Sequence, residues 1–212
     1  MTDPCRLYLI TPPLAAADLP TFAPLFAEAL VAGAAASALV RFAPGAESDG
    51  KRILGPLIDA ASRADVALLV DNDARLAARA GADGAHIAGA GPALAEALDS
   101  LHPERIVGVG LLRLRDEAMT AGEAGVDYVM FGEPRRDGWT PPFEETLERA
   151  GWWAEIFETP CVAYASTLEE AEKLAAVGAD FVALGEAIWR ADDPKAAAAA
   201  ARARIGAAAK RR

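Results

Sequence analysis

The chain has 212 residues, of which 53% are hydrophobic and 25% charged, and its formal net charge is −10 at neutral pH. This composition is that of a folded globular protein, and the negative charge argues against general nucleic-acid binding, which needs a basic surface. No apolar run approaches the ~18 residues of a membrane span, and the first residues lack the basic and apolar stretches of a secretion signal. We therefore expect a cytoplasmic protein that binds neither membranes nor nucleic acid.

Eight short apolar runs alternate with helix-like segments along the chain. Such runs are typical of strands that are buried on both faces. The runs are Arg6–Thr11, Ser37–Arg41, Val66–Val70, Gly84–Ile87, Arg105–Gly110, Asp127–Gly132, Pro160–Ala165 and Asp180–Gly185. The helix-like segments are Leu19–Val31, Lys51–Ser62, Asp73–Ala80, Pro92–Ser100, Asp116–Ala124, Pro142–Phe157, Leu168–Val177 and a last helix from about Pro194 to the end.

Three segments, which begin at Gly81, Gly125 and Gly178, repeat one short pattern: a glycine, an apolar residue, an aspartate and an apolar run. A glycine suits the left-handed position after a helix, and an apolar run of this length suits a strand. The pattern is therefore the second half of a repeated βαβ unit. Strict alternation over eight units predicts a parallel eight-stranded (β/α)8 barrel, the TIM-barrel fold, with residues 1–212 in a single domain.

Ligands bind such barrels at the C-terminal ends of the strands, so the arginines found there are candidates for a site. Arg41 ends an otherwise apolar strand, where its charge needs either an anionic ligand or an acid on a neighbouring strand. Arg135 and Arg136 lie in a loop between Gly132 and Gly138, where bidentate donors could hold a phosphate. The alternative for this pair is a solvated loop charge.

Three further strand ends carry residues with possible chemistry. Asp71 and Asp73 could ligate Mg²⁺, which takes one or two carboxylates plus substrate phosphates, although such residues also commonly cap helices. His86 could contact a ligand or transfer a proton, or it could be a hydrogen-bonded interior histidine. Trp139, just after the basic loop, could stack on a heteroaromatic ring. Arg41 and His86 are the candidates for a catalytic role.

These segments together resemble the thiamine phosphate synthase family, which includes the related thiazole tautomerases, over nearly the whole chain. The resemblance is carried by Leu7–Thr11, Gly81–His86, Asp127–Gly132, Gly178–Leu184 and Ala187–Ile188. It implies a barrel that binds a pyrimidine pyrophosphate and a thiazole phosphate. It also implies that Mg²⁺ assists the loss of pyrophosphate, that the thiazole nitrogen captures the pyrimidinyl-methyl cation, and that the protein is a homodimer.

The residues expected to carry this chemistry match the family less well than the scaffold does. Of the Gln-x-Arg-x-Lys pattern only Arg41 is kept, and the Asn-Asp pair of the third strand is reversed as Asp71-Asn72. The metal-binding Asp after His86 is replaced within 88–91, and the fifth-strand Ser and nearby His are Gly110 and Leu112.

The later strand ends depart from the family in the same way. The Thr-x-Thr-Lys loop becomes Pro134–Asp137, and the Gly-Gly phosphate loop becomes Ala165-Ser166. The eighth-strand Ser becomes Glu186, which follows Gly185 and could either repel a phosphate or pair with an arginine. By the resemblance, Ser166 and Gly185 remain at positions that bind phosphate.

Two interpretations follow from these departures. In the first, the protein is a divergent thiamine phosphate synthase in which Arg41, Arg135 and Arg136 bind pyrophosphate and Asp71 or Asp73 ligates Mg²⁺. In the second, it is a catalytically inactive paralogue that binds a phosphorylated small molecule or a partner without turnover.

Overall fold

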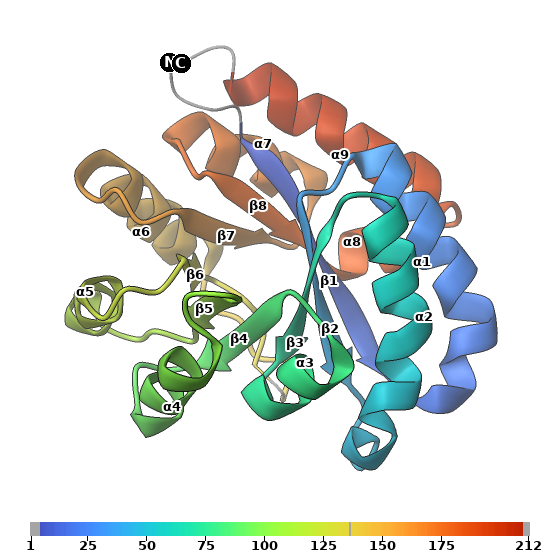
Figure 1. Cartoon of the computed structure of the whole chain (residues 1–212). Helices are drawn as coiled ribbons and strands as arrows, with labels where there is room; N and C mark the ends of the chain where they lie inside the picture. Colours follow the sequence, from blue (N-terminus) through green and yellow to red (C-terminus); the bar gives the residue numbers. More distant parts are fainter. Residues whose placement is uncertain (1–4, 136, 210–212) are drawn as a thin grey trace.

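The structure is a computed structural model that describes residues 5–135 and 137–209. Within these residues, eight strands form a closed barrel in which each strand pairs in parallel with the next and β8 pairs with β1 (Figure 1). The strands are β1 (Arg6–Leu14), β2 (Ser37–Phe42), β3 (Ala67–Asp71), β4 (Gly84–Ala88), β5 (Ile106–Gly110), β6 (Tyr128–Phe131), β7 (Cys161–Ala165) and β8 (Phe181–Leu184). The predicted (β/α)8 barrel is confirmed.

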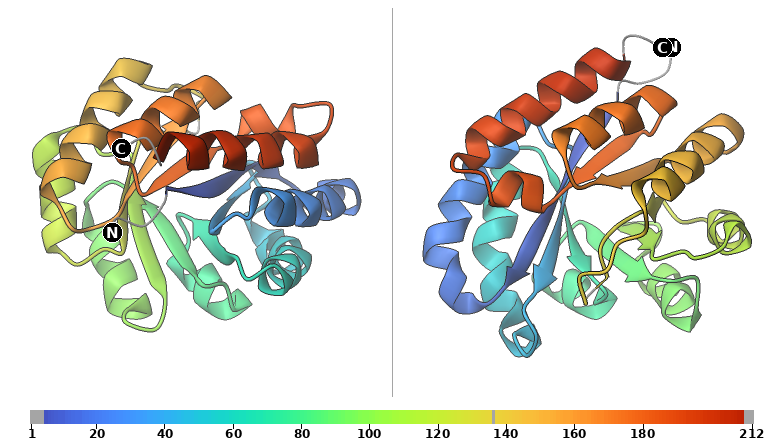
Figure 2. Two further views of the ribbon diagram at one scale, coloured as in Figure 1. Left: turned by 90° about the horizontal axis from the view of Figure 1, so that it is seen from above. Right: turned by 180° about the vertical axis from the view of Figure 1, so that it is seen from behind.

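Helices surround the barrel on the outside (Figure 2). They are α1 (Leu19–Gly33), α2 (Gly50–Arg63), α3 (Ala74–Ala80), α4 (Pro92–Leu101), α5 (Arg115–Glu123), α6 (Phe143–Ile156), α7 (Leu168–Val177), α8 (Glu186–Trp189) and α9 (Pro194–Ala209). The sequence pattern did not predict α8, because a helix of one turn is too short to show a period. The last helix, α9, packs against α1 and α7 and so closes the ring of helices. No helix in the described part of the chain is long and apolar enough to cross a membrane.

Side chains alternate between the two faces of the barrel wall. On β1, Leu7 and Leu9 pack toward the helices, whereas Tyr8 and Ile10 pack in the barrel interior. The chain contains three tyrosines, and all three belong to the interior cluster. Buried phenol hydroxyls need hydrogen-bond partners. We therefore expect these tyrosines to make hydrogen bonds to other polar groups inside the barrel.

The repeated glycine-aspartate pattern connects neighbouring strands at the N-terminal end of the barrel. The three glycines adopt left-handed φ angles of 79°, 87° and 101° after a helix. Each aspartate accepts a hydrogen bond from a backbone N–H of the preceding strand: Leu68 to Asp83 at 2.7 Å, Val107 to Asp127 at 2.7 Å, and Cys161 to Asp180 at 2.8 Å. Carboxylate acceptors make strong hydrogen bonds, so the repeat stabilises the scaffold at the end remote from the ligand site.

Candidate active site

Three adjoining cavities lie at the C-terminal ends of the strands. The first, here the inner cavity, has a volume of about 230 Å³ and is bordered by Arg41, Asp71, His86 and Glu133. The second, the outer cavity, measures about 240 Å³ and shares Glu133 with the first. The third, the β7 cavity, measures about 460 Å³ and is bordered by Ser166. Ligands of this fold bind at this end of the barrel.

Arg41 has a buried donor at the inner cavity that no described residue satisfies. Its Nε atom lies 3.9 Å from Asp71 Oδ2, which is too long for a hydrogen bond. That nitrogen is buried and makes no hydrogen bond within the described residues. An unsatisfied buried donor is costly. The structure is therefore compatible with both predicted partners of Arg41. The acid Asp71 lies on the neighbouring strand, and the Nε donor remains available for an anionic ligand.

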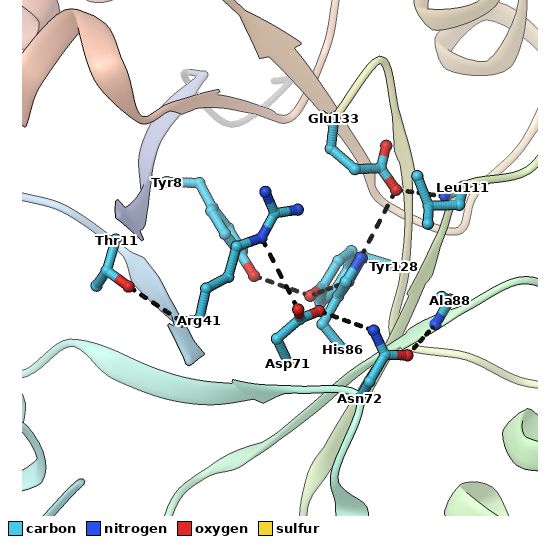
Figure 3. A network of polar contacts seen from close by, with 10 residues as sticks. All are labelled: Tyr8, Thr11, Arg41, Asp71, Asn72, His86, Ala88, Leu111, Tyr128 and Glu133. Carbon is cyan, nitrogen blue, oxygen red and sulfur yellow. Dashed lines mark hydrogen bonds and ion pairs between the residues drawn. The ribbon is translucent and has the colours of Figure 1, made fainter. Parts of the chain in front are cut away.

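Asp71 and its neighbour Asn72 have different roles. Asn72 Nδ2 donates to Asp71 Oδ1 at 3.1 Å, and Asn72 Oδ1 accepts from the backbone N–H of Ala88 at 2.7 Å. Asn72 adopts a left-handed φ of 56°, which directs its amide to the end of β4. The amide of Asn72 thus holds the strand end, while Asp71 faces Arg41 in the inner cavity (Figure 3).

Asp73 lies apart from this pair. Its carboxylate caps α3 by accepting from the backbone N–H of Leu76 at 2.7 Å, and it borders a separate cavity on the outside of the barrel. Within the described residues, no group of three or more His, Cys, Asp or Glu side chains could hold a metal ion. Mg²⁺ can bind through a single carboxylate together with substrate phosphates. Asp71, which borders the inner cavity, could be such a single carboxylate ligand. The carboxylate of Asp73 is instead used to cap α3.

A chain of three hydrogen-bonded side chains runs into the barrel interior. The hydroxyls of Tyr8 and Tyr128 are 2.9 Å apart, and the Tyr128 hydroxyl lies 2.9 Å from His86 Nδ1. All three side chains are buried. Burial raises the pKa of both tyrosines well above the usual value, so both remain neutral phenols at physiological pH. Of the two predicted roles of His86, the hydrogen-bonded interior histidine is present, and its other nitrogen faces the inner cavity.

Glu133 lies at a strand end, and the sequence assigned it no role in the site. It follows β6, its side chain is only 2% exposed, and one carboxylate oxygen accepts a short hydrogen bond from the backbone N–H of Leu111. The same oxygen, Oε1, lies 3.8 Å from His86 Nε2. A Cβ atom at Gly110 would overlap this carboxylate. The glycine at the end of β5 was therefore the available signal, since it leaves room for an inward acid.

The loop after Glu133 brings Arg135 and Trp139 together. The guanidinium carbon of Arg135 lies 4.2 Å from the centre of the Trp139 ring, a cation–π contact. The backbone N–H of Arg135 donates to the carbonyl of Trp139 at 2.9 Å. Arg135 thus covers one face of the ring that we expected to stack on a ligand, while it also borders the inner and outer cavities. Arg136, the other predicted phosphate ligand, lies outside the described residues.

The two remaining candidates follow β7 and β8, the next two strands after β6. Ser166 is exposed at the end of β7, and its backbone N–H donates to Glu170 at 2.7 Å. Gly185 is buried at the start of α8 next to the carbonyl of Ile10, where a Cβ would be 3.4 Å from that oxygen. Glu186 pairs with Arg190 at 2.8 Å, which is one of its two expected roles. The structure therefore groups Arg41, Asp71 and His86 closely and leaves Ser166 in the β7 cavity.

The sequence model of the family described as thiamine monophosphate synthase matches residues 7–188 of the chain. The chain belongs to this family. It is similar to the thiamine-phosphate synthase of Rhodospirillum centenum, with 40% identity over 94% of this chain and 96% of the relative. It is also similar to that of Hyphomonas neptunium, with 35% identity over 91% of this chain and 90% of the relative.

Solved structures agree with the fold of this thiamine monophosphate synthase family member. The thiamine phosphate pyrophosphorylase from Pyrococcus furiosus superposes with a TM-score of 0.79 at 22% identity, over 96% of both chains. The 3-hexulose-6-phosphate synthase from Salmonella typhimurium superposes with a TM-score of 0.74 at 16% identity, over 96% of this chain and 99% of that chain. At such identities the likeness shows the (β/α)8 fold alone, because this fold serves many chemistries.

Proposed function

We propose that the protein is a divergent thiamine-phosphate synthase that condenses a hydroxymethylpyrimidine pyrophosphate with a thiazole phosphate. The family membership and the names of the relatives support this activity. The observation that carries it in this chain is the buried Nε of Arg41 at the inner cavity, a donor that has no partner among the described residues. A pyrophosphate oxygen is the ligand that would satisfy it.

In this proposal Arg41 binds the pyrophosphate and stabilises the negative charge that develops as the bond to the pyrimidine breaks. Asp71 is the carboxylate that would hold Mg²⁺, and the metal would supply further neutralisation of phosphate charge when it is bound. Arg135 borders the same cavity and contributes a second cation. We place the thiazole phosphate in the β7 cavity beside Ser166 because that cavity adjoins the outer cavity at Gly132.

The test is to incubate the purified protein with both phosphorylated substrates and Mg²⁺ and to measure thiamine phosphate and released pyrophosphate. Replacement Arg41→Ala should lower kcat/KM by about 100-fold or more, since charge-assisted hydrogen bonds to a transition state contribute several kcal/mol. The matched control is Arg63→Ala, which removes an exposed arginine at the end of α2. Absence of product from the wild-type protein at high enzyme concentration would refute the activity.

A second candidate, binding of a phosphorylated small molecule without turnover, is motivated by the position of Asp73. Because its carboxylate caps α3, Asp73 adds no second aspartate beside Asp71 for binding a metal ion. Thermal unfolding in pyrophosphate, with and without Mg²⁺, separates the two candidates. A ligand that binds the folded state raises the melting temperature, so stabilisation without product formation favours the second candidate.

A further inference from the structure

The directions of the hydrogen bonds in the tyrosine chain can be assigned from the groups available. The hydroxyl of Tyr8 makes one hydrogen bond within the described residues, the one to Tyr128. If Tyr128 donated to Tyr8, the Tyr8 proton would be left without an acceptor in a buried place, which is costly. Tyr8 therefore donates to Tyr128, and Tyr128 donates to His86 Nδ1.

This assignment determines the tautomer of neutral His86. A ring nitrogen that accepts a hydrogen bond carries no proton, so the proton is on Nε2. Nε2 makes no hydrogen bond within the described residues, since Glu133 Oε1 is 3.8 Å away and that distance is too long. The inner cavity is thus offered an N–H donor by His86.

The carboxylate of Glu133 is the nearest acid to this donor, with Oε1 3.8 Å from His86 Nε2. Its Oε1 is engaged by the backbone of Leu111, and Oε2 makes no hydrogen bond within the described residues. Figure 3 shows Oε2 directed away from Leu111 and His86. Arg41, on the other side of the same cavity, provides the anion-binding group. A ligand that satisfies all of these groups has an anionic end and a polar edge with a donor next to an acceptor.

We propose that Glu133 is a specificity-determining residue that, together with His86, binds a heteroaromatic edge carrying an amino group beside a ring nitrogen. The ring nitrogen accepts from His86 Nε2, and the amino group donates to the Glu133 carboxylate. An aminopyrimidine has this edge. The assignment rests on the proposed function, because it places the pyrimidine of the pyrophosphate substrate between Arg41 and Glu133.

The test compares two ligands that differ only at this edge. The probes are the diphosphate of an aminopyrimidine and the same diphosphate without the amino group, titrated calorimetrically into the wild-type protein. Both share the anionic end, so only the amino group distinguishes them. We expect the amino compound to bind about tenfold more tightly or better, the effect of one hydrogen bond to a charged group.

The variant is Glu133→Gln. Its amide oxygen remains the acceptor for Leu111, so its NH₂ group replaces Oε2 and faces the ligand amine as a second donor. The preference for the amino compound should then fall to about twofold or less, because two donors cannot pair. The control Glu155→Gln makes the same change on an exposed residue of α6 and should keep the wild-type preference.

The outcomes separate this inference from the proposed function. Equal binding of the two probes to the wild-type protein would overturn the inference even if thiamine phosphate is formed. This comparison uses the wild-type protein alone, so it does not depend on whether the variant folds. An unchanged preference in Glu133→Gln would overturn it as well. A preference that is lost in Glu133→Gln supports it, and if the wild-type protein then forms no thiamine phosphate, only the proposed activity fails.

Discussion

The carboxylate of Glu133 occupies the space that a side chain at Gly110 would need. A Cβ atom at position 110 would overlap Glu133 Oε1 and would lie 2.7 Å from His86 Nε2. Glycine at the end of β5 and an inward acid after β6 are therefore one structural feature. The departure of Gly110 from the serine that the family resemblance implies has its physical reason in this contact.

Replacement Gly110→Ala should consequently lower the free energy of unfolding by about 1–3 kcal/mol, the usual cost of overpacking. In a Glu133→Ala background the same replacement should cost less, because the overlapping carboxylate is gone. Urea unfolding of the four proteins in this cycle gives the coupling. Gly206→Ala serves as the control, since a Cβ there would meet no atom of another described element within 4 Å. An equal cost in both backgrounds would show that the overlap is not the cause.

The hydrogen-bond chain predicts an order of stability between two tyrosine variants. Tyr128→Phe removes the partner of both Tyr8 and His86, and each buried polar group left unpaired costs about 1–3 kcal/mol. Tyr8→Phe removes one donor and leaves the bond between Tyr128 and His86 intact. Tyr128→Phe should therefore be the less stable variant in urea unfolding. The reverse order would contradict the role of Tyr128 as the shared hydrogen-bond partner of Tyr8 and His86.

The barrel could be predicted from the sequence because its signals are local. The repeated glycines take the left-handed angles that the turn after a helix requires, and the aspartates that follow them bind the preceding strands. Arg41, Asp71 and His86 could also be predicted as site candidates, because they lie at or near the C-terminal ends of strands. In a parallel barrel these ends all lie on one side.

The rest of the site depends on the orientations of side chains, which cannot be read from the order of residues in the sequence. Asp71 and Asp73 are two residues apart, yet one faces Arg41 and the other caps α3. The sequence assigned Glu133 no role, and only the contact with Leu111 shows that its side chain turns inward. Arg135 and Trp139 were expected to bind separate parts of a ligand, but they stack on each other.

The buried thiol of Cys5 predicts a loss of stability in alkali. Burial, with a smaller contribution from Asp180, raises its pKa from 9.0 to about 12. The folded state then keeps a proton that the unfolded state loses above pH 9. The free energy of unfolding should therefore be unaffected below pH 9 and fall between about pH 9 and 12, by up to about 1.4 kcal/mol per pH unit.

The measurement is urea unfolding at several pH values between about 8 and 11. Cys5→Ala should show a shallower fall than the wild-type protein, although Cys161 and the buried tyrosines still contribute because burial raises the pKa of each. Ser62→Ala, an exposed change near the end of α2, should keep the wild-type slope. Identical slopes for Cys5→Ala and the wild-type protein would refute the linkage.

Asp71 and Asp73 should differ in what their removal changes. Asp71 faces Arg41 in the inner cavity, so Asp71→Asn should raise the Mg²⁺ concentration needed for tight pyrophosphate binding by about tenfold or more, because the amide oxygen carries no charge. Asp73→Ala should leave the Mg²⁺ requirement unchanged and lower the free energy of unfolding by about 1 kcal/mol, the usual cost of losing an N-cap. Calorimetric titration with pyrophosphate at graded Mg²⁺ concentrations, together with urea unfolding, measures both effects. Asp73→Ala could instead shift the Mg²⁺ requirement as much as Asp71→Asn does. In that case the metal would have to lie within reach of both Asp71 and Asp73. The capping hydrogen bond from Leu76 to Asp73 would then have to break when the ion binds.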